Sequence, residues 1–243
     1  MQNLKPTAMV PVRPLHWLTK SDESSTVRYQ ELVNTISAHL HLKLLNTDIA
    51  KQQTIILRYI LEQISLKRFG SGAHLDQLEI DLSMLLDDEH NVRWLKDNVA
   101  MVTISCAAKI LIANGYTDTP IRLLDIMGIK VARYYYSSRY DPFFEAAIHK
   151  NWKVMRYLVE HHYVTNGYML ASPIYTLMKL YRRKVFDAND HPKIADLVKL
   201  CENRLNEPVD DGRLLCWHAN QQDIPWFQNI LLQHNAKMYP ENL

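Results

Sequence analysis

Apolar residues recur at three- and four-residue steps along most of the chain, which is the spacing of one buried face of an α-helix. In the first half this pattern predicts a helix that ends before Asn46 and a second helix that Asp48 can cap. Their inward-facing positions are expected at Val33, Ile36, Leu40 and Leu44, and then at Ile49, Ile56, Ile60 and Ile64. The glycines of Gly70-Ser71-Gly72 are expected to stop the second helix.

The third predicted helix has the clearest amphipathic pattern in the chain. Its apolar positions are Leu75, Leu78, Leu82, Leu85 and Leu86, and acidic residues occupy the other side. A fourth, long helix is expected from Asn91 to Asn114, with Val102 facing inward. Pro120 suits the first turn of a fifth helix that Gly128 closes.

The composition changes after Gly128, where a β-prone and tyrosine-rich stretch precedes further helical patterns. We therefore expect an extended lead-in over residues 1–24, a helical region over 25–128 and a second region over 129–243. No charge block or low-complexity linker separates the halves, which predicts that they share one core.

Composition supports a folded and mostly helical protein. Hydrophobic residues make up 47% of the 243 residues and charged residues 22%, and only six glycines are present. The formal net charge of +2 is too small to indicate nucleic-acid binding from the global field. Any such role would depend on a local patch.

The cysteines and the apolar runs indicate a cytoplasmic protein. Cys106, Cys201 and Cys216 are odd in number and lack the paired spacing of a zinc site, which favours buried thiols in a reducing compartment. The proline-interrupted N-terminal residues do not resemble a secretory signal. No stretch has enough uncharged apolar residues to suggest a transmembrane segment.

The C-terminal half contains a repeated pattern, best preserved between Asp141 and Tyr163. Asp141-Pro142-Phe143 opens the unit, Ala146-Ala147 supplies a small pair, and Val154-Met155 with Leu158-Val159 supplies a second helix. This arrangement resembles an ankyrin repeat, in which a capping residue and a proline start the first helix and small residues let two helices approach closely. Phe144, Lys150 and His162-Tyr163 depart from the family pattern.

Two further units resemble the same family less closely. The second begins at Ser172-Pro173-Ile174, and its second helix is expected only at about His191, after an insertion over residues 182–189 that lengthens the first helix or forms a loop. The third runs from Asp210 to Lys237 and would be a terminal capping unit, in which Asn235 can take the left-handed conformation of the usual glycine. The resemblance implies an all-α fold, in which an N-terminal helical bundle continues into an ankyrin-like α-solenoid.

The resemblance also implies a surface for a protein partner, made by the finger before the first unit and by exposed positions of the first helix of each unit. Tyrosine, tryptophan and arginine, which are abundant there, often dominate binding energies. The expected partner-binding residues are Tyr134, Tyr135, Tyr136, Arg139, Tyr140, Glu145, His149, Tyr175, Lys179, Arg182 and Trp217. The alternative is that these aromatic residues only pack the core.

Other chemistry has weaker signals in the sequence. Arg182-Arg183-Lys184 could contribute to a phosphate-binding stripe, or could be a solvated insertion. The histidines lack metal-ligand spacing, so no metal or cofactor is expected. Cys216 and His218 are two residues apart on a predicted helix and do not face each other, and no nucleotide-binding or hydrolase motif is present.

The sequence therefore favours a non-catalytic protein-binding scaffold. By analogy alone, its divergent repeats suggest a bacterial or viral effector that acts in the cytoplasm of a host cell. The alternatives are a helical enzyme with a site between the N-terminal helices and the repeats, a nucleic-acid or membrane-surface module, and a homo-oligomer that uses the tyrosine cluster on itself.

Overall fold

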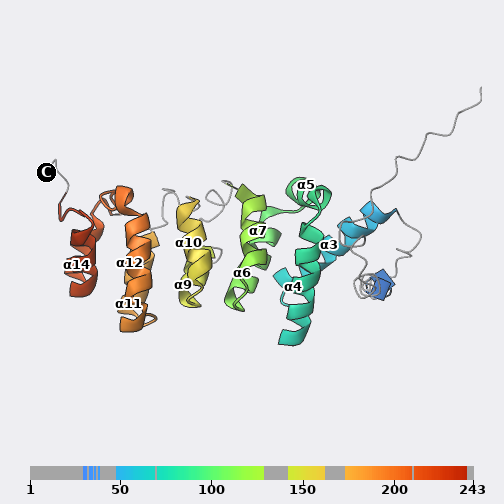
Figure 1. Ribbon diagram of the computed structural model, residues 1–243, viewed down its shortest axis with the longest axis horizontal. Helices are drawn as coiled ribbons and strands as arrows, with labels where there is room; N and C mark the ends of the chain where they lie inside the picture. Colours follow the sequence, from blue (N-terminus) through green and yellow to red (C-terminus); the bar gives the residue numbers. More distant parts are fainter. Residues whose placement is uncertain are drawn as a thin grey trace, which may run out of the picture. The chain divides into compact units, whose positions relative to one another are not determined.

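The computed structural model describes residues 30–31, 33–34, 36, 38, 48–68, 70–128, 142–161, 173–209 and 211–239 (Figure 1). Within these ranges every regular element is a helix, which confirms the predicted all-α class. The expected lead-in over residues 1–24 lies outside the described residues, as does the tyrosine-rich stretch from 129 to 141.

The chain folds as two compact units. The first comprises residues 1–63 and 69–99, and the second comprises 64–68 and 100–243. The last boundary between the two units along the chain falls between Val99 and Ala100. The reason is that the two helices between residues 101 and 127 pack against later helices of the second unit.

The first unit contains α3 (Ile49–Ser65), α4 (Gly72–Leu86) and α5 (Glu89–Asn98). The last two residues of α3 belong to the second unit. The apolar stripe predicted for α4 is buried as expected. Ser71 caps α4 by accepting a hydrogen bond from the His74 N–H, and Asp88 caps α5 by accepting one from the His90 N–H. Helix α4 contacts α5.

Two predictions for this part of the chain are wrong at the level of helix boundaries. Helix α3 ends at Ser65, ahead of the glycines, and Lys67 takes the left-handed conformation with a φ of 54°. The long helix predicted from Asn91 breaks at Val99 and Ala100, which are both extended. Because the break shifts the helical register, Val102 is 48% exposed instead of facing inward.

The inner face predicted for α3 is largely confirmed. Ile56, Ile60 and Ile64 are completely buried. Ile49, by contrast, is 43% exposed, because it is the first residue of the helix, where fewer neighbours cover a side chain. Val33 and Ile36, from the predicted preceding helix, are helical and buried.

The described part of the second unit contains four pairs of consecutive α-helices. Their bounds are α6 (Met101–Ala113) with α7 (Asp118–Met127), α9 (Pro142–Ile148) with α10 (Trp152–Glu160), α11 (Pro173–Arg182) with α12 (His191–Leu200), and α13 (Leu215–Gln221) with α14 (Pro225–Gln233). The short 3-10 helices η4 (Ala188–Asp190) and η5 (Glu202–Arg204) lie before and after α12. The predicted start of α12 at about His191 is confirmed, and the insertion before it forms a turn followed by η4.

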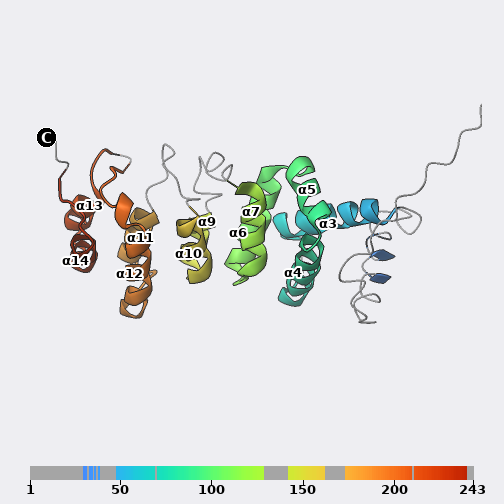
Figure 2. The same ribbon diagram turned by 45° about the horizontal axis from the view of Figure 1, so that its top comes forward.

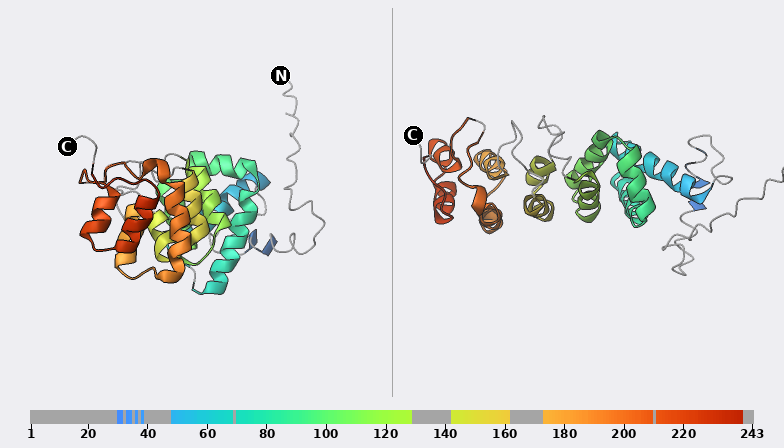
Figure 3. Two further views of the ribbon diagram at one scale, coloured as in Figure 1. Left: turned by 60° about the vertical axis from the view of Figure 1, so that its left-hand side comes forward. Right: turned by 90° about the horizontal axis from the view of Figure 1, so that it is seen from above.

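The four pairs pack in two layers, and the order of the pairs follows the sequence (Figures 1 and 2). The first helices form one layer, in which α6 contacts α9, α9 contacts α11, and α11 contacts α13. The second helices form the other, with contacts from α7 to α10, from α10 to α12, and from α12 to α14. The view from above in Figure 3 shows the same succession of pairs.

Each first helix ends in the same turn, which has a residue in the left-handed conformation. Gly115, Lys150, Lys184 and Asp223 occupy this position, with φ values of 89°, 52°, 61° and 52°. In every case this residue and the next donate N–H hydrogen bonds back to carbonyls of the preceding helical turn, which is the Schellman arrangement. The turns recur about every 35 residues.

Small and apolar residues fill the space between the layers. Ala146 and Ala147, the small pair predicted from the sequence, are fully buried on α9, and Phe143 beside them is 1% exposed. Asn235, just after α14, has a φ of 62°, so it does take the left-handed conformation expected for it. Contacts between successive pairs extend the buried core from one pair to the next.

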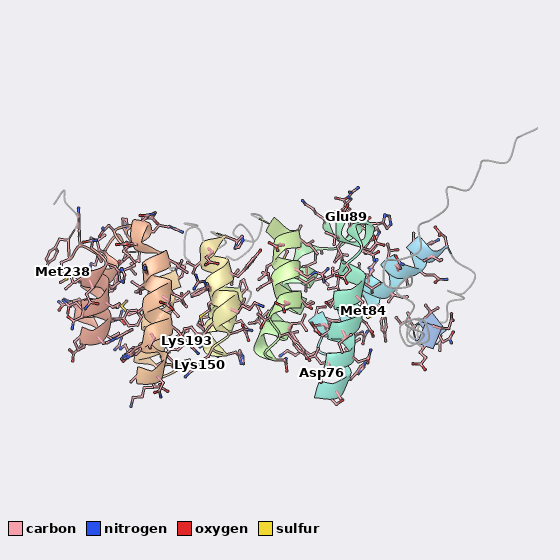
Figure 4. All side chains as sticks on the ribbon, viewed as in Figure 1. Asp76, Met84, Glu89, Lys150, Lys193 and Met238 are labelled. Carbon is pink, nitrogen blue, oxygen red and sulfur yellow. The ribbon has the colours of Figure 1, made fainter. Side chains whose placement is uncertain are left out.

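Polar contacts at the turns link neighbouring pairs. Lys150, in the turn after α9, donates a hydrogen bond to Asp190 at 2.8 Å, and Asp190 directly precedes α12. The aromatic rings of Trp152 and Phe186 lie 5.5 Å apart beside this ion pair, and the Lys193 ammonium lies 5.3 Å from the Trp152 ring. Figure 4 shows Lys150 and Lys193 close together beside α10 and α12.

A second cluster joins the last two pairs. The His191 ring stacks on Trp226 with 3.7 Å between centroids, and its Nε2 lies 2.8 Å from the Tyr181 hydroxyl. Phe227 is fully buried with its ring edge-on to Tyr181. Aromatic residues at the turns therefore contribute much of the contact between the third and fourth pairs.

Candidate partner-binding surface

Six of the residues predicted to bind a partner are described by the structure, and all six lie on or next to first helices of the second unit. Glu145 is on α9, Tyr175, Lys179 and Arg182 are on α11, and Trp217 is on α13. His149 directly follows α9. The other five, Tyr134, Tyr135, Tyr136, Arg139 and Tyr140, lie outside the described residues. Because α9 contacts α11 and α11 contacts α13, the six positions come from three neighbouring helices of one layer.

At α9 the predicted residues form a small ionic group. The Glu145 carboxylate lies 3.1 Å from Lys109 Nζ of α6 and 3.3 Å from His149 Nε2. Only 14% of the Glu145 side chain is exposed, against 40% for His149. Glu145 thus holds α6 against α9, and His149 is the member of this group that solvent or a partner can reach.

Between α11 and α13 the contacts form a continuous chain. The Lys179 ammonium lies 3.9 Å from the centre of the Tyr175 ring, and that ring lies 4.8 Å from the His218 ring on α13. His218 Nε2 is 3.0 Å from the Asp211 Oδ1 atom. Tyr175 is partly exposed and Lys179 is exposed, whereas the His218 side chain is only 8% exposed.

Electrostatics at Asp211 favour its ionised form. Desolvation by itself would raise the pKa of this carboxyl group. The hydrogen bond with His218, the backbone N–H of Arg213 and the charges of these two residues outweigh desolvation and lower its pKa below the ordinary value. Asp211 therefore provides a fixed negative charge that orients the buried His218 ring.

Trp217 lies beside this chain of contacts on α13. The Arg213 guanidinium lies 3.9 Å above the Trp217 ring, and the rings of Trp217 and His218 meet edge to face. Trp217 is partly exposed and Arg213 is mostly exposed. The pair presents a cation over a flat aromatic surface, which can contact an apolar or an acidic group.

The sequence pattern did not identify Lys109, Asp211, Arg213 or His218 as members of this surface. A signal was available in the repeated turns. In each of the last three pairs, the residue five positions before the left-handed residue is polar and lies on the first helix. These residues are Glu145, Lys179 and His218. Polar side chains at one repeated position on adjacent helices are brought side by side by the stacking of the pairs.

Cys216 and His218, which are two residues apart on α13, have different surroundings. Burial raises the pKa of the Cys216 thiol, which disfavours the reactive thiolate. His218 Nε2 is engaged by Asp211. The two residues therefore have separate environments on α13.

No group of three or more His, Cys, Asp or Glu side chains suitable for a metal ion occurs among the residues that the structure describes. None of the described helices is long and apolar enough to cross a membrane.

No family of proteins, no curated protein and no solved structure matches this chain significantly.

Proposed function

We propose that the second unit is a divergent ankyrin-like stack that binds a protein partner through its layer of first helices. The observation that carries this proposal is the chain of contacts from Lys179 through Tyr175 to His218 and Asp211. It joins two adjacent helices, because the exposed Lys179 and the partly exposed Tyr175 of α11 are held against the buried His218 of α13. Side chains that are already ordered lose little entropy when a partner covers them.

The repeated turn supports the ankyrin-like part of the proposal. Four helix pairs closed by the same left-handed turn, in two layers, are the packing expected of a stacked repeat array. We propose the fourth pair as the capping unit; its helix α14 exposes the polar Asn229 and Gln233 together with Leu232, which is 45% exposed. The partner's identity, a role as an effector in a host cell and a cytoplasmic location remain predictions.

Site-specific photocrosslinking tests the proposed surface. A photoreactive amino acid at Lys179, on the first-helix layer, is expected to capture a partner from cells that contain one. The same residue placed at Lys199, which is exposed on α12 in the other layer, is the matched control. Capture at position 179 should fall when Tyr175 and Trp217 are both replaced by alanine, because these aromatic groups border the site.

Two results would count against the proposal. One is equal capture of the same protein from positions 179 and 199, which would show that the first-helix layer has no special role. The other is undiminished capture at position 179 in the folded Tyr175→Ala and Trp217→Ala double variant. Circular dichroism spectra and thermal unfolding of each variant establish that it is folded.

A further inference from the structure

Basic side chains at the end of α11 lack the carboxylate partners that six other described Lys and Arg residues of the second unit have. Lys179, Arg182, Arg183 and Lys184 are all exposed, and none of them forms an ion pair with another described residue. We define these four residues as the α11 basic patch. Elsewhere in the unit Lys109, Lys150, Lys153, Arg156, Arg204 and Arg213 are each within ion-pair distance of a carboxylate.

The surplus of positive charge is local to one helix pair. Residues 173–200, which contain α11 and α12, carry six Lys and Arg against three Asp. Two of these three, Asp187 and Asp190, lie within ion-pair distance of Lys150 of the preceding pair. The acids of this pair are thus largely committed elsewhere, and the positive field at the end of α11 is not balanced internally.

Helix stability alone does not account for the patch. A cation near a helix C-terminus interacts favourably with the helix dipole. However, the last turns of α6 and α9 contain no basic residue, and they end in the same type of turn. Arg183 and Lys184 also lie beyond the last residue of α11.

The backbone holds the patch in place. The Lys184 N–H donates to the Tyr181 carbonyl at 2.9 Å, and the Val185 N–H donates to the Leu180 carbonyl at 3.1 Å. Lys184 therefore has a fixed left-handed conformation with a φ of 61°. A partner that binds these cations would have to order only their side chains.

We infer that the α11 basic patch binds a short acidic segment of a partner protein. This inference rests on the proposed function and names the chemistry of the partner. Arginine guanidinium groups bind carboxylates through paired, charge-assisted hydrogen bonds. The neighbouring Tyr175 gives such a segment a partly exposed aromatic ring to contact beside its carboxylates.

The surroundings favour a short acidic segment over a long polyanion. The adjacent pair bears Asp211 near α13 and Asp223 at the turn that corresponds to Lys184. The exposed Asp223 carboxylate, which forms no ion pair with a described residue, would repel a phosphate backbone that continued along the layer. With a chain net charge of only +2, a nucleic acid would gain little from the rest of the protein.

Fluorescence anisotropy of the full chain provides the test. The probe is a labelled peptide of alternating Asp, Glu and Leu with one Tyr, and its counterpart has Lys in place of every acid. The Arg182→Gln and Arg183→Gln double variant is expected to bind the acidic probe about fivefold more weakly, as two exposed ion pairs would be lost. The matched double variant Lys193→Gln and Lys199→Gln removes the same charge from α12 and should change affinity by less than about twofold.

Three results would contradict the binding of an acidic segment by the α11 basic patch. Equal weakening by the two double variants would show an effect of net charge alone and would overturn the inference. Tighter binding of an oligothymidylate, or of anionic lipid vesicles, than of the acidic peptide would assign the patch to another class of partner. Absence of binding to the acidic peptide at low ionic strength, where screening is weakest, would also refute it.

The photocrosslinking experiment separates this inference from the proposed function. If a partner captured at position 179 is displaced by the acidic peptide and not by its Lys counterpart, both proposals are supported. If the partner is captured but the acidic peptide neither binds nor competes, the binding layer stands and the acidic chemistry is wrong. If the peptide binds but capture is independent of layer, the proposed function fails.

Discussion

Two turns with nearly the same backbone and different side-chain contacts permit a quantitative test of the packing. Lys150 and Lys184 both have left-handed φ values and donate the same kind of N–H hydrogen bond into the preceding helix. For a residue with a Cβ this conformation costs about 1–2 kcal/mol. Glycine avoids that strain but makes the unfolded chain more flexible, which costs about 0.4–1 kcal/mol.

For Lys184→Gly the backbone effect should dominate. The side chain is exposed and forms no ion pair with a described residue. Subtracting the entropic cost of glycine from the relieved strain leaves a gain of about 0.5–1 kcal/mol in the free energy of unfolding.

For Lys150→Gly the lost ion pair should outweigh the same gain. Lys150 Nζ lies 2.8 Å from Asp190 Oδ2, and the Asp190 side chain is only 10% exposed. Leaving a nearly buried carboxylate without its cation costs about 1–3 kcal/mol. Because 37% of the Lys150 side chain faces water, we expect the loss of this ion pair to cost about 1–2 kcal/mol. After the backbone gain is subtracted, the free energy of unfolding of this variant should be lower by about 0.5–1 kcal/mol.

Urea unfolding followed by circular dichroism near neutral pH measures both changes. The control is the Asp190→Asn background, in which the nearly buried carboxylate is gone and only the exposed Asp187 carboxylate remains within ion-pair distance of Lys150. There Lys150→Gly should become neutral or stabilising, as Lys184→Gly is in the parent chain. The reasoning is refuted if the two glycine variants have the same effect in the parent chain, or if Asp190→Asn leaves the effect of Lys150→Gly unchanged.

Three further predictions follow from burial and charge. Phe227→Ala should lower the free energy of unfolding by about 3–5 kcal/mol in urea titrations, since a fully buried aromatic ring is removed; a loss below about 1 kcal/mol would contradict the packing of the last pair. Folding lowers the pKa values of Asp190 and Asp211, so the two ionised carboxylates stabilise the folded chain above the unfolded pKa of about 4. This stabilisation is lost as the pH falls through the folded pKa values. Asp211→Asn should therefore make the melting temperature depend less on pH in the acid range. Burial raises the pKa of Cys201 to about 11, so alkylation of the native protein near neutral pH should leave Cys201 unmodified until urea is added, as peptide mass spectrometry can establish.

Apolar periodicity was sufficient to predict the existence of most helices. It located α4 because the leucine stripe and the acidic side alternate without interruption. The delayed start of α12 was also predictable, because Pro192 and the capping residue Asp187 mark it in the sequence. Both signals are local, so tertiary contacts are not needed to read them.

The spacing of apolar residues did not predict the break between α5 and α6, because the helical spacing continues through it. Leu95, Val99 and Val102 have helical spacing, so one long helix was the natural prediction. The structure places two extended residues between α5 and α6, and no glycine or proline marks them. The ends of these two helices are set by how each packs with its own neighbours, which the spacing of apolar residues does not contain.

The candidate surface was predictable in residue type and helix but not in its contacts. Tyr175 and Lys179 were identified as first-helix positions, and they do lie on α11. Their connection to His218 depends on the contact of α11 with α13, about 40 residues later in the chain. The role of Glu145 as an internal ion-pair partner of Lys109 likewise needed the contact of α6 with α9.

The repeated turn explains why the first of the four pairs went unrecognised. The left-handed residue is held by two backbone hydrogen bonds and by the packing of the helices around it, so glycine, lysine or aspartate can occupy it at a difference of about 1–2 kcal/mol. Such a cost is small beside the apolar surface that each pair buries against the next. The residue at the turn can therefore vary while the backbone geometry of the turn stays the same. The pair of α6 and α7 has this turn at Gly115, although α6 does not begin with the proline-containing motif that opens α9 at Pro142 and α11 at Pro173.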